Sequence, residues 1–308
     1  MNNTLLIKEY IKALIENIDK KQLPKELNLI FDGGLFNCGF STGVALYIKT
    51  LEETNLISVK KLSGCSAGSL IALWYIGGCN ELGIDYFETI MQTFKRDLNF
   101  SQFKSSVAEF VDHLFKLENN DYKPISILDD KLFINYYDAS KNKQKVISKF
   151  TDRAHLIKCI LRSCHIPYLI DGNARCEERY LDGIVPYIFN DGESLFIKLL
   201  TFNKFTRSFI LKSEANIHFR LLSGVSDAND FFTRGNSDMC CYISHRSYND
   251  IFLLRAREMA SIVCFFILDF LILFKNALPP SVKNSFIYNG AINTSKCLVK
   301  DIFKKLIC

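Results

Sequence analysis

Several features that identify common classes of protein are absent from this sequence of 308 residues. Its eleven cysteines form no CxxC pair and no His/Cys ligand spacing, so neither a zinc site nor a disulfide framework is indicated. There are no internal repeats, no low-complexity segments and no lysine-bearing phosphate loop, which argues against repeat proteins and P-loop nucleotide-binding proteins. The odd cysteine count and the lack of a signal peptide predict reduced thiols in an intracellular compartment.

Long apolar runs and a strong net charge are also missing. The most apolar segment, within 250–275, has an uninterrupted core of about 14 residues and contains Asp269, whereas a membrane-spanning helix needs roughly 20 apolar residues. We interpret this segment first as a buried helix and second as a membrane-docking helix. The formal charge is only +5, and Lys and Arg are not interleaved with aromatic residues, so no nucleic-acid partner is expected.

A Gly-x-Ser-x-Gly pentapeptide is present at 64–68. It stands between a short apolar run, 59–62, and a helical pattern that begins at Leu70. A strand, a tight turn and a helix in this order are typical of a nucleophile elbow with Ser66 as the nucleophile. Gly64 and Gly68 would supply the small residues that so tight a turn requires. A strand-to-helix loop with a capping serine is the simpler interpretation of the same residues. The neighbouring segments are therefore needed to choose between a loop and a nucleophile elbow.

Two further segments place glycine or acid at the end of an apolar run. Upstream, Leu27–Phe31 stops before Gly33-Gly34, and a helix is expected over 41–53. Such a turn exposes backbone N–H groups beside a helix N-terminus, which suits an oxyanion hole or a bound phosphate. Downstream, Asp182-Gly183 ends another short apolar run, and Asp171, in a hairpin-turn signal, is the alternative acid.

In this order the three segments resemble the patatin-like phospholipase family over roughly residues 27–190. The resemblance implies an α/β fold, a three-layer sandwich with a central, mostly parallel sheet flanked by helices. It also implies a serine–aspartate dyad without histidine, in which Ser66 is the nucleophile and Asp182 accepts its proton. The oxyanion hole would be formed by the backbone N–H groups of Gly33, Gly34 and Leu35.

The substrate implied by the resemblance is a phospholipid or an acylglycerol, hydrolysed through an acyl-serine intermediate without calcium, other metals or a cofactor. A cytoplasmic protein with peripheral membrane association is expected. The tail over 295–306 places lysines among apolar residues, a pattern suited to an anionic interface or to a solvated terminal helix.

The sequence departs from the family pattern inside the glycine loop. Leu35, Asn37 and Cys38 stand where the family has a glycine, a basic residue and a glycine. Two alternatives therefore stay open. One is a lipid-binding or scaffold protein of the same fold that has lost turnover. The other is an α/β-hydrolase with a Ser-Asp-His triad, to which His218 or His245 would contribute.

The remaining pattern predicts the organisation of the chain. We expect an N-terminal amphipathic helix within 1–24, a catalytic domain over 25–205 and a C-terminal extension over 206–308. Further elements are expected as two helices within 86–117, a helix over 125–137, a strand at 146–147, a helix over 154–164 and a strand over 194–202. Residues 203–249 are polar and predict little regular structure.

Overall fold

The computed structural model describes residues 3–117, 121–183, 185–199, 210–211 and 214–307. The described strands form one mixed sheet with the order β4-β3-β2-β1-β6-β7, and β5 pairs with β3 off this path. They are β1 (Glu26–Phe31), β2 (Ser58–Cys65), β3 (Leu132–Asp138), β4 (Lys143–Ile147), β5 (Tyr180–Leu181), β6 (Ser194–Ile197) and β7 (Cys240–Tyr242). The central pairs β3–β2, β2–β1 and β1–β6 are parallel, whereas β4, β5 and β7 run antiparallel to their neighbours.

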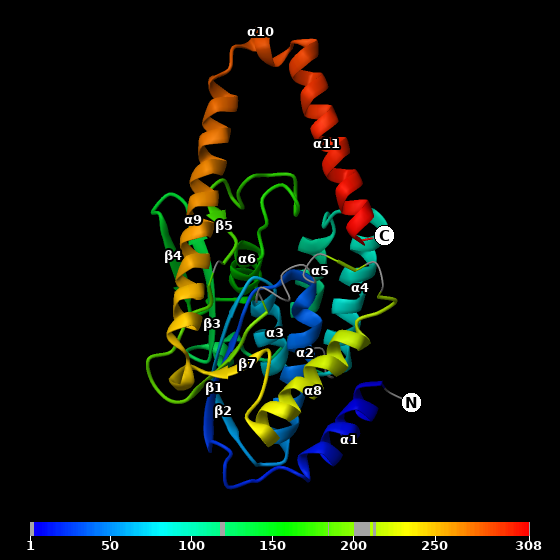
Figure 1. Cartoon of the computed structure of the whole chain (residues 1–308), viewed down its shortest axis with the longest axis vertical. Coiled ribbons are helices and arrows are strands. Elements are labelled where there is room, and N and C mark those ends of the chain that lie inside the picture. Colours follow the sequence, from blue (N-terminus) through cyan, green and yellow to red (C-terminus); the bar gives the residue numbers. More distant parts are fainter. Residues whose placement is uncertain (1–2, 118–120, 184, 200–209, 212–213, 308) are drawn as a thin grey trace.

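Helices flank this sheet (Figure 1). The described helices are α1 (Asn3–Ile15), α2 (Cys38–Glu53), α3 (Ala67–Ile76), α4 (Glu81–Asp97), α5 (Phe103–Phe115), α6 (Arg153–Ser163), α8 (His218–Arg234), α9 (Tyr248–Ala277), α10 (Pro280–Lys283) and α11 (Phe286–Ile307). Short 3-10 turns lie at η1 (Leu35–Asn37), η2 (Ile125–Leu128) and η4 (Ile243–His245). The predicted α/β class is confirmed as a helix-flanked sheet that is mostly but not wholly parallel.

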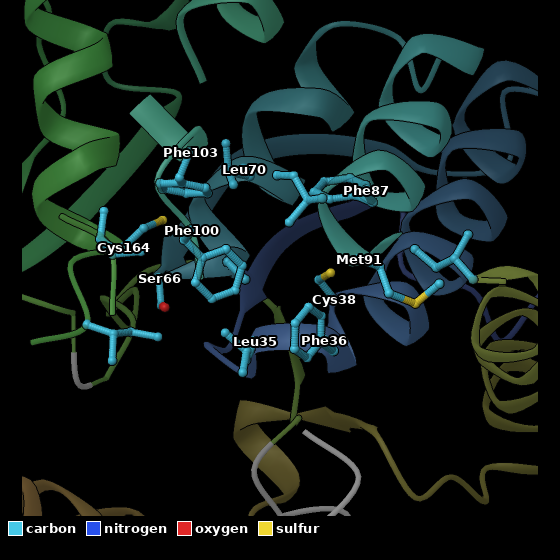
Figure 2. A pocket seen from close by; sticks show the side chains of 15 residues that line it. Leu35, Phe36, Cys38, Ser66, Leu70, Phe87, Met91, Phe100, Phe103 and Cys164 are labelled. Atoms are coloured by element: carbon cyan, nitrogen blue, oxygen red, sulfur yellow. The ribbon is translucent and has the colours of Figure 1, made fainter. Parts of the chain in front are cut away.

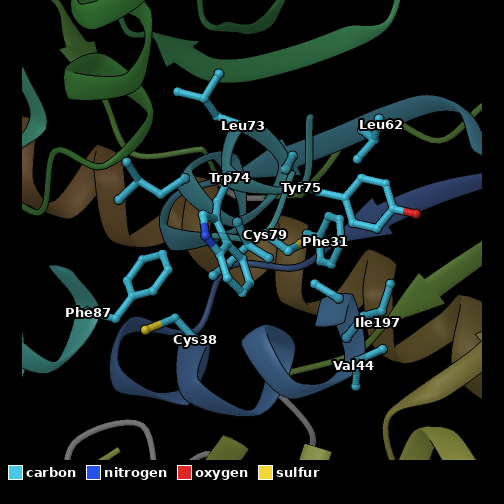
Figure 3. Close-up of a cluster of buried hydrophobic side chains, with 14 of the residues drawn as sticks. Phe31, Cys38, Val44, Leu62, Leu73, Trp74, Tyr75, Cys79, Phe87 and Ile197 are labelled. Carbon is cyan, nitrogen blue, oxygen red and sulfur yellow. The ribbon is translucent and has the colours of Figure 1, made fainter. Parts of the chain in front are cut away.

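Side chains of β1 alternate between two apolar layers, because successive residues of a strand point to opposite faces. Leu29 and Phe31 join the large core with α2 and α3, where Trp74 and Tyr75 are fully buried (Figure 3). Ile30 points to the other face and joins a smaller cluster, completed by Phe189, Phe196 and the partly buried Leu254 of α9. The sheet is therefore covered on one face by α2 and α3 and on the other by part of α9.

The pattern of apolar residues predicted most of the elements around the site. The N-terminal helix, the two helices α4 and α5, the strand β4 and the helix α6 are confirmed with shifted ends. The helix expected over 125–137 is wrong, because Leu132–Asp138 is the buried strand β3. A short apolar run with no polar face fits a buried strand and a buried helix equally well, and only its place between β2 and β4 decides.

The predicted C-terminal extension holds elements that the sequence reading did not foresee. The predicted boundary at 205/206 and the end of the strand expected over 194–202 lie outside the described residues. Beyond them, β7 extends the sheet next to β6, and α8 crosses α2 so closely that a Cβ on Gly43 would meet the Leu221 carbonyl oxygen at 2.0 Å. Tyr47 of α2 also donates a hydrogen bond to Asn229 of α8, at 3.1 Å. Residues 218–234, expected to be irregular, thus form a helix packed on the core.

The segment 250–275 is helical, as expected, but it is not a buried helix. It lies within the long helix α9, on which many large apolar side chains are exposed, among them Phe266 and Phe270. In the part of the chain that the structure describes, no helix has a stretch long and apolar enough to cross a membrane.

Candidate active site

Ser66 occupies the sharp turn between β2 and α3. Its backbone has φ 51° and ψ −134°, a conformation that costs a residue with a side chain about 1–3 kcal/mol. Only small residues fit around it. A Cβ on Gly64 would meet the Gly68 carbonyl oxygen at 2.4 Å, and a Cβ on Gly68 would meet the Phe31 carbonyl oxygen at 2.5 Å. The pentapeptide thus forms a strand-to-helix elbow rather than a relaxed loop.

The glycine loop that follows β1 lies against this elbow. A Cβ on Gly33 would stand only 3.0 Å from the Cβ of Ser66. Gly34 is packed against Leu199, because a Cβ on Gly34 would stand only 2.7 Å from the Leu199 Cβ. Leu35 has a left-handed backbone with φ 48°, which is costly for a leucine, and its side chain lines the same pocket as Ser66. The structure therefore brings the three predicted oxyanion residues beside the predicted nucleophile.

Asp182 directly follows β5, and its carboxyl group lies within hydrogen-bond reach of Ser66. Ser66 is a hydrogen-bond partner of its carboxyl group, and the Oδ1 atom of Asp182 is fully buried without a partner among the described residues. Burial raises the pKa of Asp182 to about 8, and the hydrogen bond from Ser66 opposes only part of that rise. An acid with this pKa takes up and releases a proton near neutral pH, as a general base must.

Ser163 at the end of α6 holds the elbow and the acid together, a role that the sequence reading missed. Its hydroxyl accepts a hydrogen bond from the Ser66 backbone N–H at 2.9 Å and donates one to the Asn135 carbonyl at 2.7 Å. Its carbonyl accepts from the Gly183 N–H at 3.0 Å, and the His165 carbonyl accepts from the Asp182 N–H at 3.1 Å. A small residue in the predicted 154–164 helix was the only available signal.

Ser66 opens on an apolar pocket with an empty volume of about 610 Å³, including its mouth. The lining residues come from η1, from the first turns of α2 and α3, from α4 and α5, and from the segments after α6 and before α8. Ser66 supplies a hydroxyl at one side, and Phe87 and Met91 lie at the far side in the view of Figure 2. Apart from Ser66, the lining is hydrocarbon, aromatic ring and sulfur, so the pocket suits an extended apolar chain.

Arg257 of α9 is a second residue that the sequence reading missed. Its guanidinium donates two hydrogen bonds to Asp32, at 2.7 and 2.8 Å, and Asp32 is only 1% exposed. Asp32 directly precedes Gly33-Gly34 and also accepts a hydrogen bond from the Leu199 N–H at 3.3 Å. The positive charge of Arg257 lowers the pKa of Asp182, against the larger effect of burial. A helix about 200 residues downstream in the chain therefore supports the loop beside the nucleophile.

Arg220 of α8 supports the other end of the loop. Its side chain is fully buried, and its Nη1 donates to the Asn37 side-chain oxygen at 2.9 Å. Glu214 neutralises Arg220 through two hydrogen bonds, at 2.6 and 2.9 Å, and the Asn37 amide donates to the Leu199 carbonyl at 3.2 Å. The loop has no basic residue of its own at position 37, but a guanidinium from α8 lies behind it.

The competing site residues lie elsewhere in the fold. Asp171 is exposed at a turn, while Asp182 is beside Ser66. His218 is the first residue of α8 and not part of a strand, and the exposed His245 packs its ring on Tyr242 at 5.7 Å. No histidine is among the residues that line the pocket at Ser66. Within the described residues, no three His, Cys, Asp or Glu side chains gather as a metal site would require.

Comparison with known proteins adds no relative to this description. Neither a scan against protein-family models nor a search of the curated proteins finds a match for this chain.

Proposed function

We propose that this chain is a lipid acyl hydrolase of the phospholipase A type, built on a patatin-like fold. The observation that carries the proposal is the strained elbow serine that hydrogen-bonds a buried aspartate at the mouth of an apolar pocket. The carboxyl group supplies the base, the glycine loop supplies backbone donors, and the pocket supplies a place for an acyl chain. Each part has a separate sequence signal, and the fold brings them together.

The reaction follows from these positions. As the Ser66 Oγ attacks the ester carbonyl carbon, Asp182 takes the hydroxyl proton, and the N–H groups of Gly33, Gly34 and Leu35 hold the negative oxygen. Collapse of this intermediate expels the alcohol, which takes the proton from Asp182, and leaves an acyl group on Ser66. A water molecule then gives a proton to Asp182 and attacks the acyl carbon. As the fatty acid leaves, the Ser66 Oγ takes that proton back from Asp182, which restores the hydroxyl and the carboxylate.

Leu35 bears on the alternative of a lipid-binding relative without turnover. A leucine replaces the third glycine of the family pattern, yet it keeps a left-handed backbone with φ 48°. The cost of that conformation, about 1–2 kcal/mol, is met by its packing against the pocket and the core. The loop thus retains the turn that a glycine would give, which supports hydrolysis over binding alone.

The test is turnover combined with covalent labelling of the purified full chain. A short-chain p-nitrophenyl ester and phospholipid vesicles, both with EDTA present, should be hydrolysed. A fluorophosphonate should label one residue, Ser66, as identified by peptide mapping, and labelling should stop turnover. Lipid binding with neither turnover nor labelling would instead support the non-catalytic alternative.

The pocket makes a further prediction about the acyl chain. Met91, 3% exposed, lies on the side of the pocket away from Ser66. Met91→Trp fills this end, so turnover of a long-chain ester should fall roughly tenfold or more, while that of a butyrate ester stays within about twofold. The measurement is kcat/KM over a series of p-nitrophenyl esters, with Met91→Leu as the volume-matched control. An equal loss for all chain lengths would argue against an acyl pocket.

A further inference from the structure

The helix α9 is attached to the rest of the protein along one face. Its contacts include the Arg257–Asp32 pair, the Asp250–Lys198 ion pair at 3.4 Å, the Asp269–Arg175 ion pair and the Phe265 ring against Tyr137, with 5.1 Å between centroids. Leu254, on the same face, packs against the apolar cluster around Ile30. At about 100° per residue, positions 250, 257, 265 and 269 fall within an arc of about 120°. The remainder of the helix surface faces away from these contacts.

That free surface carries an apolar stripe. Its members follow one another at steps of seven, four, three, four and three residues, the spacing with which a helix presents one face. Every member is at least half exposed: Phe252 (70%), Met259 (60%), Val263 (50%), Phe266 (56%), Phe270 (66%) and Leu273 (68%). Figure 1 shows α9 rising along the domain and beyond it to α10, from which α11 returns. A stripe of this size marks an interaction surface.

The charge of the C-terminal segment that carries the stripe indicates what covers it. Residues 246–308 contain nine Lys or Arg and four Asp or Glu, a balance of +5 that equals the net charge of the whole chain. The first 245 residues are neutral, with 29 of each sign. Lys275 ends α9, Lys304 and Lys305 end α11, and all three are exposed. Within α9 itself three bases and three acids balance, so the excess lies at Arg246 and in the segment after α9. A C-terminal segment that is both apolar and basic fits anionic lipid, whereas a second copy of this segment would carry the same positive charge.

We propose that the outer stripe of α9, here the α9 stripe, docks on an anionic lipid bilayer. Met259 of the stripe lies on the opposite side of the helix from Arg257, so the docked surface is about one helix diameter, about 10 Å, from the Asp32 side of the glycine loop. The docking stands on the exposed stripe of α9 and on the positive charge of the segment that follows this helix. The docking deepens the proposed function, because it would place the pocket beside a bilayer. Only the statement that the bilayer supplies the substrate rests on the proposed function.

Flotation with lipid vesicles tests the docking, and the Ser66→Ala chain is used so that hydrolysis does not alter the lipid. We expect this chain to float with vesicles of phosphatidylcholine and phosphatidylserine, to float less with phosphatidylcholine alone, and to be released by salt. Phe266→Ser with Phe270→Ser should lower the partition coefficient roughly tenfold or more. The matched control is Leu6→Ser with Tyr10→Ser, an apolar i,i+4 pair on α1. Each of its two side chains is 53% exposed, so its exposure is comparable to that of the α9 pair. This control should float as the parent does.

Three results would overturn the docking. The first is equal flotation of the Phe266/Phe270 variant and its parent, with both melting at the same temperature. The second is equal loss of flotation in the α1 control. The third is a parent chain that is dimeric in size-exclusion chromatography, with a monomeric Phe266/Phe270 variant and no flotation of either, which would assign the α9 stripe to a second copy. Turnover of a soluble ester by the wild-type chain reports separately on the proposed function.

Discussion

Replacing Ser66 by alanine is expected to lower kcat/KM for a short-chain ester by roughly 10⁴-fold or more, and Asp182→Asn by roughly 10³–10⁴-fold. Alanine removes the attacking oxygen, and asparagine keeps the shape of the aspartate but cannot accept the proton. The measurement is initial-rate hydrolysis of a soluble p-nitrophenyl ester by purified variants.

The control variants remove the competing residues one at a time. Asp171→Asn, His218→Ala and His245→Ala should each stay within about twofold of the wild type, because none of these side chains is part of the site described above. Loss of turnover in a histidine variant, together with survival in Asp182→Asn, would favour the triad over the dyad.

The same aspartate sets the pH dependence of the reaction. Burial raises the pKa of Asp182 to about 8, and only the ionised carboxylate can accept the serine proton. The value of kcat/KM should therefore rise with pH through about pH 8 and level off above it. A profile that is flat from pH 6 to pH 9 would contradict Asp182 as the base.

Ionisation of Asp182, which activity requires, should also make the folded protein less stable. Its pKa is about 8 in the folded protein and about 3.9 in the unfolded chain. Between these values the folded protein keeps a proton that the unfolded chain has released, so the free energy of unfolding falls as the pH rises from about 4 to about 8. At about 1.4 kcal/mol for each pH unit, the total is several kcal/mol.

Asp182→Asn removes this titration. The inactive variant should therefore be more stable than the wild type at pH 8 and lose that advantage near pH 4. Urea unfolding followed by circular dichroism at both pH values measures the difference. An identical pH dependence in the two proteins would mean that the carboxyl group is not held in its protonated form by burial.

Replacing Arg257 by glutamine is expected to have the largest cost in stability, about 3–5 kcal/mol. Asp32 is 1% exposed and takes two hydrogen bonds from Arg257, so the variant leaves a buried carboxylate without its cation. Turnover should fall as well, because Asp32 adjoins the glycine loop. Loss of the positive charge should also move the pH profile upward, since Arg257 lowers the pKa of Asp182. Thermal unfolding and the pH dependence of kcat/KM are the measurements.

Arg255 provides the matched control on the same helix. It is 73% exposed and pairs with Glu258, so Arg255→Gln should change stability by less than about 0.5 kcal/mol and leave the pH profile in place. Adding Asp32→Asn to Arg257→Gln should recover part of the lost stability, because the unpaired charge is then gone. Equal melting of Arg255→Gln and Arg257→Gln would show that the Asp32 pair does not hold α9 to the domain.

Local patterns in the sequence, together with the family resemblance that they carry, were enough to predict the residues of the candidate site. The elbow around Ser66 needs small neighbours and a strand and a helix on its two sides, and all of these are visible within about 20 residues. The same holds for Gly33-Gly34 after a buried strand and for Asp182 at the end of a short one. The strand β3 was misread as a helix because a short apolar run has no period that separates the two.

The supports of the site were not predictable in this way. Arg257 and Arg220 resemble any other arginine in the sequence. The helix α8 does show helical spacing in the sequence, at Leu221, Val225 and Ala228, but the polar residues between them hid it. The partners of the two arginines, Asp32 and Asn37, lie more than 180 residues away in the chain. Pairing at such separation depends on how α8 and α9 pack on opposite sides of the sheet, which no local pattern encodes.

By itself, then, the sequence determined which residues are expected at the candidate site, since turn geometry, small residues and apolar spacing are local properties. Only the tertiary structure decided that Ser66, Asp182 and the glycine loop meet at one apolar pocket. It also decided that a fully buried guanidinium group from α8 and a partly buried one from α9 brace the loop. It left the apolar side of α9 exposed as well. The physical reason is that burial and charge pairing are properties of the packed chain, set by contacts between segments that are distant in sequence.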